Sequence, residues 1–182
     1  GSRVALAQFG YVGKPYALTD HSISGLVPIE HLQEAANQAP GINLGTGAVN
    51  FARDIILKSL EINQANIART AATYAASNKT TLSGTSQWSD YSGTSDPVSN
   101  VEDYKDVIRS KVGLLPNTIL LPYTVFKKLK SHPKILDRIK YTGRESVTTE
   151  ILAGLFEIEN VVVGKSIYQD ADGNMQDVWG ND

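Results

Sequence analysis

The chain has 182 residues, of which 41% are hydrophobic and 20% charged, a composition that excludes a disordered chain and a coiled coil. Its formal net charge of −2 argues against tight nucleic-acid binding by phosphate neutralisation, and no apolar run is long enough to span a membrane. The absence of cysteine excludes disulfides, thiolate metal sites and a cysteine nucleophile.

The first 27 residues have the pattern of an extended arm. Apolar and small residues alternate on both sides of a short segment that contains Gly10, Gly13 and Pro15. Alternation interrupted by glycine and proline is typical of two strands joined by a turn. We therefore expect a hairpin over residues 3–24.

Two helices are predicted next, a short one and a very long one. Pro28 suits the first turn of a helix that runs to Ala36, and a glycine-containing loop is expected over residues 39–47. Residues 50–76 place apolar side chains on one face without Gly or Pro, and Asn50 can cap this helix. Such a helix would be roughly 40 Å long, about the diameter of a compact domain of this size, so we expect an elongated or flattened subunit.

The second half of the chain alternates helices with short buried strands. A loop rich in Ser and Thr comes first, at residues 77–96, and its aromatic residues Trp88 and Tyr91 predict that it packs on the protein. The elements predicted after it are a helix from a Ser99–Glu102 capping box to Gly113, a strand at 117–121, helices from Pro122 and Pro133, an exposed loop at 141–146, a helix capped by Thr148, a strand at 161–163 and a hairpin around Asp172-Gly173. On the predicted helix that ends at Gly113, the residues expected to face inward are Val101, Tyr104, Ile108 and Val112.

No set of residues indicates catalysis. His21, His31 and His132 lie in different segments; His31 is assigned to a solvated helix face and His132 to a helix junction. The Gly45-Thr46-Gly47 segment lacks the lysine and the preceding strand of a phosphate-binding loop, so a flexible linker is the better interpretation. We therefore expect no catalytic residue and no cofactor.

Two further patterns also favour a structural explanation. Asp170, Asp172 and Asn174 resemble the start of a calcium loop, but Gly173 is misplaced and the required glutamate is missing, so a hairpin tip is favoured over a metal site. The lysines of residues 127–140 have no interleaved aromatic residues, which is more typical of a solvated face than of a nucleic-acid patch.

Several short motifs occur in a characteristic order. They are Tyr16-Ala17-Leu18, Glu34-Ala35-Ala36-Asn37, Asp96-Pro97-Val98, Leu115-Pro116-Asn117-Thr118-Ile119-Leu120-Leu121, His132-Pro133, Val161-Val162-Val163-Gly164 and Val178-Trp179-Gly180. Their order and spacing resemble those of the major capsid proteins of tailed bacteriophages and prophages. The resemblance implies an α+β, Hong Kong 97-type capsid fold with a long spine helix, an extended arm hairpin (the E-loop), a peripheral domain and an axial domain.

The resemblance also implies how the chain is divided. Residues 1–27 would be the remnant of the arm, and residues 28–97 the peripheral domain with its spine helix at 50–76. Residues 98–175 would form the axial domain, and residues 176–182 a truncated return strand to the peripheral domain.

The same resemblance implies assembly contacts and partners. The residues that would make assembly contacts are Lys14, Tyr16, Leu18 and His21 in the arm, and Tyr141, Arg144 and Glu145 in the axial loop. The partners would be other copies in hexamers and pentamers, scaffold, portal or other head proteins, and double-stranded DNA enclosed without sequence-specific binding, with no membrane. The protein would be part of the virion and would assemble in the bacterial cytoplasm.

Two alternatives remain open from the sequence. An encapsulin-like shell would keep the fold and enclose proteins instead of DNA. A small-ligand-binding α/β module would use residues 117–163 as a crossover sheet, and would need a concave pocket with convergent polar groups.

Overall fold

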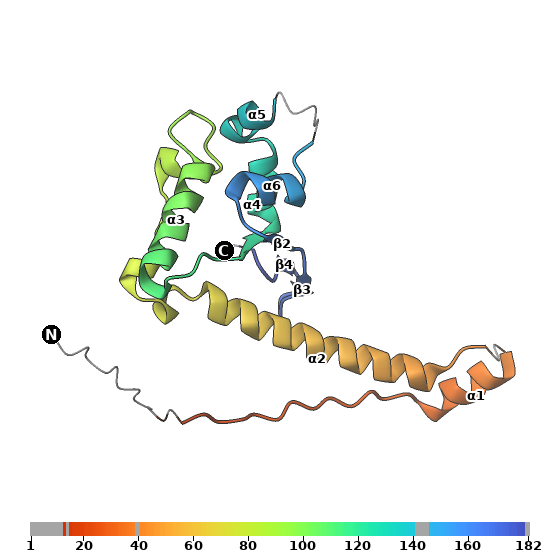
Figure 1. Ribbon diagram of the computed structural model, residues 1–182. Coiled ribbons are helices and arrows are strands. Elements are labelled where there is room, and N and C mark those ends of the chain that lie inside the picture. Colours follow the sequence, from red (N-terminus) through yellow and green to blue (C-terminus); the bar gives the residue numbers. More distant parts are fainter. Residues whose placement is uncertain (1–12, 14, 39–40, 141–145, 181–182) are drawn as a thin grey trace. The chain divides into compact units, whose positions relative to one another are not determined.

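The computed structural model describes residues 13, 15–38, 41–140 and 146–180 (Figure 1). The chain divides into two units, Gly1–Leu57 and Lys58–Asp182. The boundary falls within the long helix α2 (Leu44–Arg69), so each unit contains one part of this helix.

The described residues of the first unit form a short helix and the beginning of α2, and none of them is buried. Residues 15–28 have no regular secondary structure, so the predicted hairpin is wrong for this half of the arm; residues 3–12 lie outside the described part. A strand needs a partner to satisfy its backbone, and residues 15–28 pair with no described strand. Helix α1 (Ile29–Gln38) follows Pro28, whose carbonyl accepts a hydrogen bond from the Leu32 amide at 3.3 Å, which confirms the predicted short helix.

Helix α2 begins at Leu44 rather than at Asn50. Its cap is Asn43, whose Oδ1 accepts a hydrogen bond from the Thr46 amide at 2.9 Å. The Gly45-Thr46-Gly47 segment therefore belongs to the start of the helix, and the expected flexible linker is wrong at these positions.

The same helix ends at Arg69 rather than at residue 76. Thr70 leaves the helical conformation with ψ 106°, while its hydroxyl donates to the Asn66 carbonyl at 2.5 Å. Two 3₁₀ turns, Ala71–Thr73 and Ala76–Asn78, follow in place of the predicted last helical turns.

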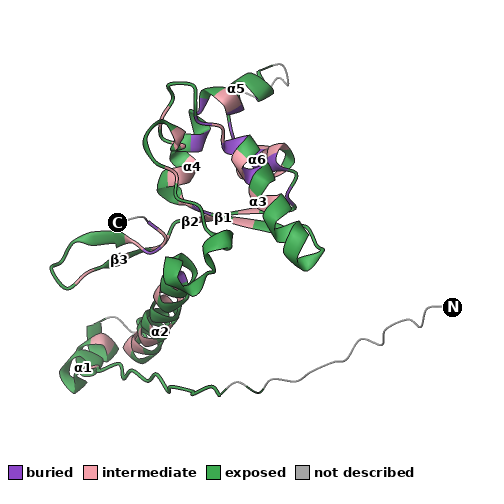
Figure 2. Cartoon of the chain, turned by 90° about the vertical axis from the view of Figure 1, so that its left-hand side faces the viewer, coloured by how far each residue is buried: buried purple, intermediate pink, exposed green. Residues whose placement is uncertain are grey.

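The second unit holds the hydrophobic core. Its elements are α3 (Pro97–Val112), β1 (Thr118–Pro122), α4 (Tyr123–Lys130), α5 (Pro133–Ile139), α6 (Thr149–Phe156), β2 (Asn160–Gly164), β3 (Ile167–Gln169) and β4 (Met175–Asp177), preceded by a 3₁₀ turn at Gly84–Ser86. The core is made by Val98, Leu129, Ile135, Leu152 and Phe156, all almost fully buried. Figure 2 shows the buried parts of the chain gathered mainly around α4 and α6. The mixed helix and strand content confirms the predicted α+β class at this coarse level.

The strands form two separate pairs. β1 and β2 are parallel, with Leu120 opposite Val162, and the Asn160 amide donates to the Asn117 carbonyl at 2.9 Å. Parallel neighbours require a crossover connection, which α4, α5 and α6 provide. β3 and β4 form an antiparallel hairpin, as predicted.

Helix α3 differs from the prediction in its capping residue and in which of its apolar residues are buried. Asp96 is the cap, because its carboxylate accepts a hydrogen bond from the Ser99 amide at 3.2 Å; the Ser99–Glu102 capping box is wrong. The helix ends at Gly113, whose φ of 74° suits glycine, as expected. Val101 is buried, but Ile108 and Val112 are exposed, because only the first turns of α3 pack on the core.

The loop at residues 77–96 packs on the protein, which confirms its predicted role. The Trp88 indole donates to the Asn100 side chain at 3.0 Å, and the Tyr91 hydroxyl donates to the Lys128 carbonyl at 2.9 Å. These two bonds attach the loop to α3 and to α4.

The Asp96 cap yields a stability prediction. The Asp96→Ala variant loses the cap and the ion pair with Lys134, whose Nζ lies 3.1 Å from Oδ2, so the free energy of unfolding should fall by about 1–2 kcal/mol. Asp96→Asn retains the capping oxygen and loses only a partly exposed ion pair, so it should cost less than about 1 kcal/mol. Urea unfolding of both variants tests this; equal losses would assign the stabilisation to the ion pair instead.

Candidate interaction surfaces

The described part of the chain offers no centre for metal chemistry. Among these residues, no group of three or more His, Cys, Asp or Glu side chains could hold a metal ion. None of the described helices is both long enough and apolar enough to cross a lipid bilayer.

His132 is a buried structural residue at the junction of α4 and α5. Its Nε2 lies 3.2 Å from the Ser95 hydroxyl, and the Tyr91 ring packs against it edge-on at 5.6 Å. Nδ1 is buried without a hydrogen-bond partner in the described structure. Burial lowers the pKa of His132, although the nearby Asp96 opposes this effect, so the ring is neutral at pH 7. This confirms the predicted helix junction.

The Asp170 carboxylate holds the hairpin tip together. Oδ1 accepts hydrogen bonds from the Asp172 and Asn174 amides at 3.0 and 2.8 Å, and Oδ2 accepts one from the Gln176 side chain at 3.0 Å. The Gln176 bond and these amide bonds lower the pKa of Asp170. The structure thus confirms the hairpin tip, since the carboxylate is used by its own turn.

The lysines of α4 and α5 lie mainly on the surface. Lys127 and Lys128 are exposed, Lys130 lies over the Phe126 ring at 5.7 Å, and Lys134 pairs with Asp96. Their exposure agrees with a solvated face, and whether they contact nucleic acid stays a prediction.

The described residues of the first unit and of α2 expose many large apolar side chains. Among the described residues of the first unit none is buried, and α2 as a whole buries only Ala65. The large apolar residues that α2 exposes are Val49, Phe51, Ile55, Leu57, Leu60 and Ile67. Phe51 alone is 67% exposed. Exposed apolar side chains in this number mark α2 as a candidate interaction surface.

The arm residues expected to make assembly contacts are also exposed. Tyr16 and Leu18 are each 85% exposed, and His21 is exposed as well. Lys14 and the axial-loop residues Tyr141, Arg144 and Glu145 lie outside the described residues.

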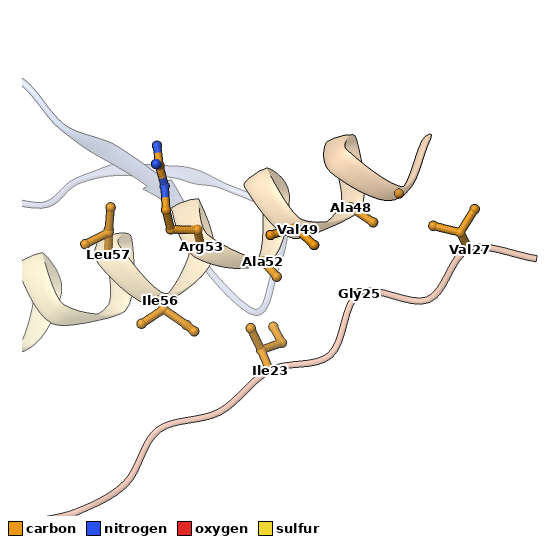
Figure 3. A pocket seen from close by; sticks show the side chains of 10 residues that line it. Ile23, Gly25, Val27, Ala48, Val49, Ala52, Arg53, Ile56 and Leu57 are labelled. Carbon is orange, nitrogen blue, oxygen red and sulfur yellow. The ribbon is translucent and has the colours of Figure 1, made fainter. Parts of the chain in front are cut away.

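A groove lies between the extended arm segment and α2 within the first unit (Figure 3). We call it the arm groove; it has a volume of about 590 Å³ and is lined by Ile23, Gly25, Val27, Gly45, Ala48, Val49, Ala52, Arg53, Ile56 and Leu57. The Ile23 side chain points toward α2 beside Ala52 and Ile56. Gly25 permits a close approach, because a Cβ there would lie 2.9 Å from the Ala48 carbonyl oxygen.

The carboxyl-terminal half of α2 is hydrogen-bonded to residues on both sides of the β3–β4 hairpin. The Glu61 carboxylate accepts hydrogen bonds from the Ser166 hydroxyl at 2.8 Å and the Trp179 indole at 3.0 Å. The Ser166 bond in particular lowers the pKa of Glu61. The Arg69 guanidinium donates to the Val178 carbonyl at 3.3 Å. This helix end is thus tied to the segment that follows the β3–β4 hairpin.

Comparison with known proteins identifies the family. The sequence model described as phage major capsid protein E matches residues 65–182. The chain belongs to the phage major capsid protein E family. This confirms the resemblance to phage major capsid proteins.

Individual relatives agree with this family. The major capsid protein of Burkholderia phage BcepMu is 35% identical over 163 residues, covering 90% of this chain and 51% of the relative. That of Pseudomonas phage JBD67 is 30% identical over 161 residues, covering 87% and 49%. The chain spans about half the length of the curated relatives it matches.

A solved structure shares the fold of this capsid-family chain. The crystal structure of a phage-related protein from Bordetella bronchiseptica RB50 matches with a TM-score of 0.80 and 37% identity, covering 94% of this chain and 56% of that one. Members named major capsid proteins are structural proteins, so the family confirms the expectation that the chain is not an enzyme.

The exposed side chains of α2 are the candidate contacts that sequence reasoning missed. The apolar pattern of residues 50–76 correctly indicated a helix, but Phe51 and Ile55 were expected on its packed face. An amphipathic pattern identifies the apolar face of a helix and not the molecule that covers it. In this capsid-family chain the Phe51 and Ile55 side chains are exposed.

His132 yields a pH-dependence prediction. Because the pKa of His132 is lowered in the folded state, the unfolded chain binds the extra proton first, and stability should fall as pH drops below about 6.5, the ordinary histidine value. The free energy of unfolding should decrease by up to about 1.4 kcal/mol per pH unit between about pH 6.5 and 5.5.

Urea titrations at several pH values measure this slope. The slope should be reduced in His132→Asn and retained in His31→Asn, which alters an exposed histidine. An unchanged slope in His132→Asn would assign the pH dependence to other groups.

Gly25 yields a prediction about the arm groove. In Gly25→Ala the new methyl group would collide with Ala48, so the arm segment should move away from α2. Nuclear Overhauser contacts between the Ile23 methyl groups and α2 should weaken or vanish. Gly13→Ala is the matched control, because a Cβ at Gly13 meets no atom within 4 Å; equal effects of the two changes would refute the close approach.

Proposed function

We propose that the chain is a structural subunit of a phage capsid and that it acts by associating with further copies of itself. The observation that best supports this is the first unit, whose described residues expose many large apolar side chains and bury none. An extended segment and a helix without a core gain stability only by covering another surface. In homo-oligomers that surface is supplied by other copies related by symmetry.

The finer division of the subunit follows the Hong Kong 97-type arrangement. We propose an arm at 1–27, a peripheral domain at 28–97, an axial domain at 98–175 and a return segment at 176–182. The long α2 helix supports the spine helix of this proposal, and the buried core residues lie within the proposed axial domain. Lys14, Tyr16, Leu18 and His21 would contact one neighbour, and Tyr141, Arg144 and Glu145 would lie near a symmetry axis.

The proposed assembly consists of hexamers and pentamers that enclose double-stranded DNA in the virion. Contact with DNA would be independent of sequence, which suits a chain with net charge −2 and only a local group of lysines on α4 and α5. Scaffold, portal or other head proteins would be further partners, and assembly would take place in the bacterial cytoplasm.

The two alternatives have less support. The curated relatives given above are named for phage capsids, which does not favour an encapsulin-like compartment. A small-ligand module needs polar groups converging on an enclosed cavity. The arm groove is lined almost entirely by apolar residues and Arg53, which does not favour it.

Self-association can be tested on the apolar surface of α2. Size-exclusion chromatography with light scattering, followed by negative-stain electron microscopy, should show oligomers or ring-shaped capsomers. Burying a phenylalanine is worth about 1.5–3 kcal/mol, so Phe51→Glu should weaken association on the order of 10- to 100-fold.

The matched control is Gln64→Glu, which adds the same charge at an exposed polar position of the same helix. It should associate like the parent chain. A parent chain that stays monomeric at every concentration, or equal behaviour of the two variants, would contradict the proposed contact surface.

A further inference from the structure

Positive charge is concentrated on helices α4 and α5. Residues 127–140 contain a single acidic side chain, Asp137, although the whole chain has a net charge of −2. The basic residues of this segment are Lys127, Lys128, Lys130, Lys134, Arg138 and Lys140. The rest of the chain is therefore strongly acidic. Because the fields of clustered like charges add, this segment has a positive local potential that the net charge of the chain conceals.

One face of α4 presents two of these lysines together with an aromatic ring. Tyr123, Lys127 and Lys130 follow one another at i, i+4 and i+7, which places them on the same side of the helix. Leu129 of the same helix is buried in the core, whereas Tyr123 is 47% exposed and both lysines are exposed. The pattern of residues 127–140 lacks an aromatic residue, but the helix begins one turn earlier and supplies one. We call Tyr123, Lys127 and Lys130 the basic face.

The lysines of α4 have no counter-charge within the described part of the chain. The ion pairs formed there leave out Lys127, Lys128 and Lys130. Lys130 lies over the Phe126 ring at 5.7 Å, a contact that does not remove its charge. On α5, by contrast, Lys134 is paired with the capping carboxylate of α3. An ammonium group without a nearby carboxylate keeps its full attraction for an external anion.

We propose that the basic face of α4 contacts the phosphate backbone of the enclosed double-stranded DNA. Lysine ammonium groups are mobile point charges that bind phosphates without reading the base sequence. The Tyr123 hydroxyl can donate a hydrogen bond to a phosphate oxygen. Lys128 and Arg138 strengthen the local positive potential. This inference rests on the proposed function, which encloses DNA in the shell, and it uses none of the apolar side chains of α2.

The composition of this surface favours a polyanion over another protein chain. The buried centres of protein–protein interfaces are depleted of lysine and enriched in apolar and aromatic side chains. On α4 and α5, the large apolar side chains exposed to solvent are those of Tyr123 and Leu136, and most of the basic residues are exposed as well. A neighbouring copy that covered these lysines would have to desolvate them, which costs free energy. A DNA backbone attracts them while both sides stay hydrated.

Fluorescence anisotropy of a short labelled DNA duplex measures this contact. Two duplexes of different sequence should bind with equal affinity. Three phosphate contacts, from Lys127, Lys128 and Lys130, predict that the logarithm of the binding constant falls with the logarithm of salt concentration with a slope of about −2.7. A fourfold increase in salt should therefore weaken binding about 40-fold. No binding at low salt overturns the proposal, and so does a strong preference for one sequence.

A pair of double variants with equal net charge locates the contact. Lys127→Gln with Lys130→Gln should make the slope shallower by about 2, because each lysine contributes about one phosphate contact. Lys79→Gln with Lys165→Gln removes two exposed lysines elsewhere in the second unit and should bind DNA like the parent chain. Circular dichroism should show the same helix content in both. Equal weakening by the two double variants would reflect net charge alone and would overturn the proposal.

Light scattering on the same variants separates this inference from the proposed self-association. Both double variants should associate like the parent chain, because α2 is unchanged. If Lys127→Gln with Lys130→Gln lost association but kept DNA binding, the basic face would be a contact between copies, and the DNA contact would be refuted. A parent chain that binds DNA through these lysines but stays monomeric would support the DNA contact and contradict the self-association alone.

Discussion

The parallel pairing of β1 with β2 is the constraint on which the second unit depends. Parallel strands cannot be joined by a tight turn, so residues 123–159 must cross over one face of the pair. The three helices of that crossover contribute Leu129, Ile135 and Leu152 to the core. The loop at residues 77–96 then closes over the same core, with Ser95 beside the buried His132.

The two units differ in how their apolar residues are used. The second unit buries its own, and polar groups such as Lys105, which donates to the Phe156 carbonyl at 2.8 Å, satisfy the ends of its helices. The first unit leaves its large apolar side chains exposed on α2 and on the arm segment. The second unit therefore has a core, while the described residues of the first unit have none.

Local signals predicted most of the elements, and the errors at two helix starts came from competing local signals. Pro133, Gly113 and Thr148 each have one strong local role, and each lies at the predicted helix end. Where two possible capping residues lie close together, the sequence pattern did not identify the one that is used. Asn43 caps α2 instead of Asn50, and Asp96 caps α3 instead of Ser99. The difference between two caps is about 1 kcal/mol or less, which packing of the neighbouring turns easily outweighs.

The sequence by itself determined the α+β class, most of the helix and strand positions, the absence of a recognisable catalytic set and the family, because these depend on local patterns and on the order of motifs. Only the tertiary structure decided which apolar residues are covered. Ile108 follows Val101 by seven residues on the same side of α3, yet Val101 is buried and Ile108 is exposed. Burial depends on which other segment arrives in space, and a periodic pattern carries no information about that segment. The exposed apolar side chains of α2 could therefore be recognised only in the folded chain.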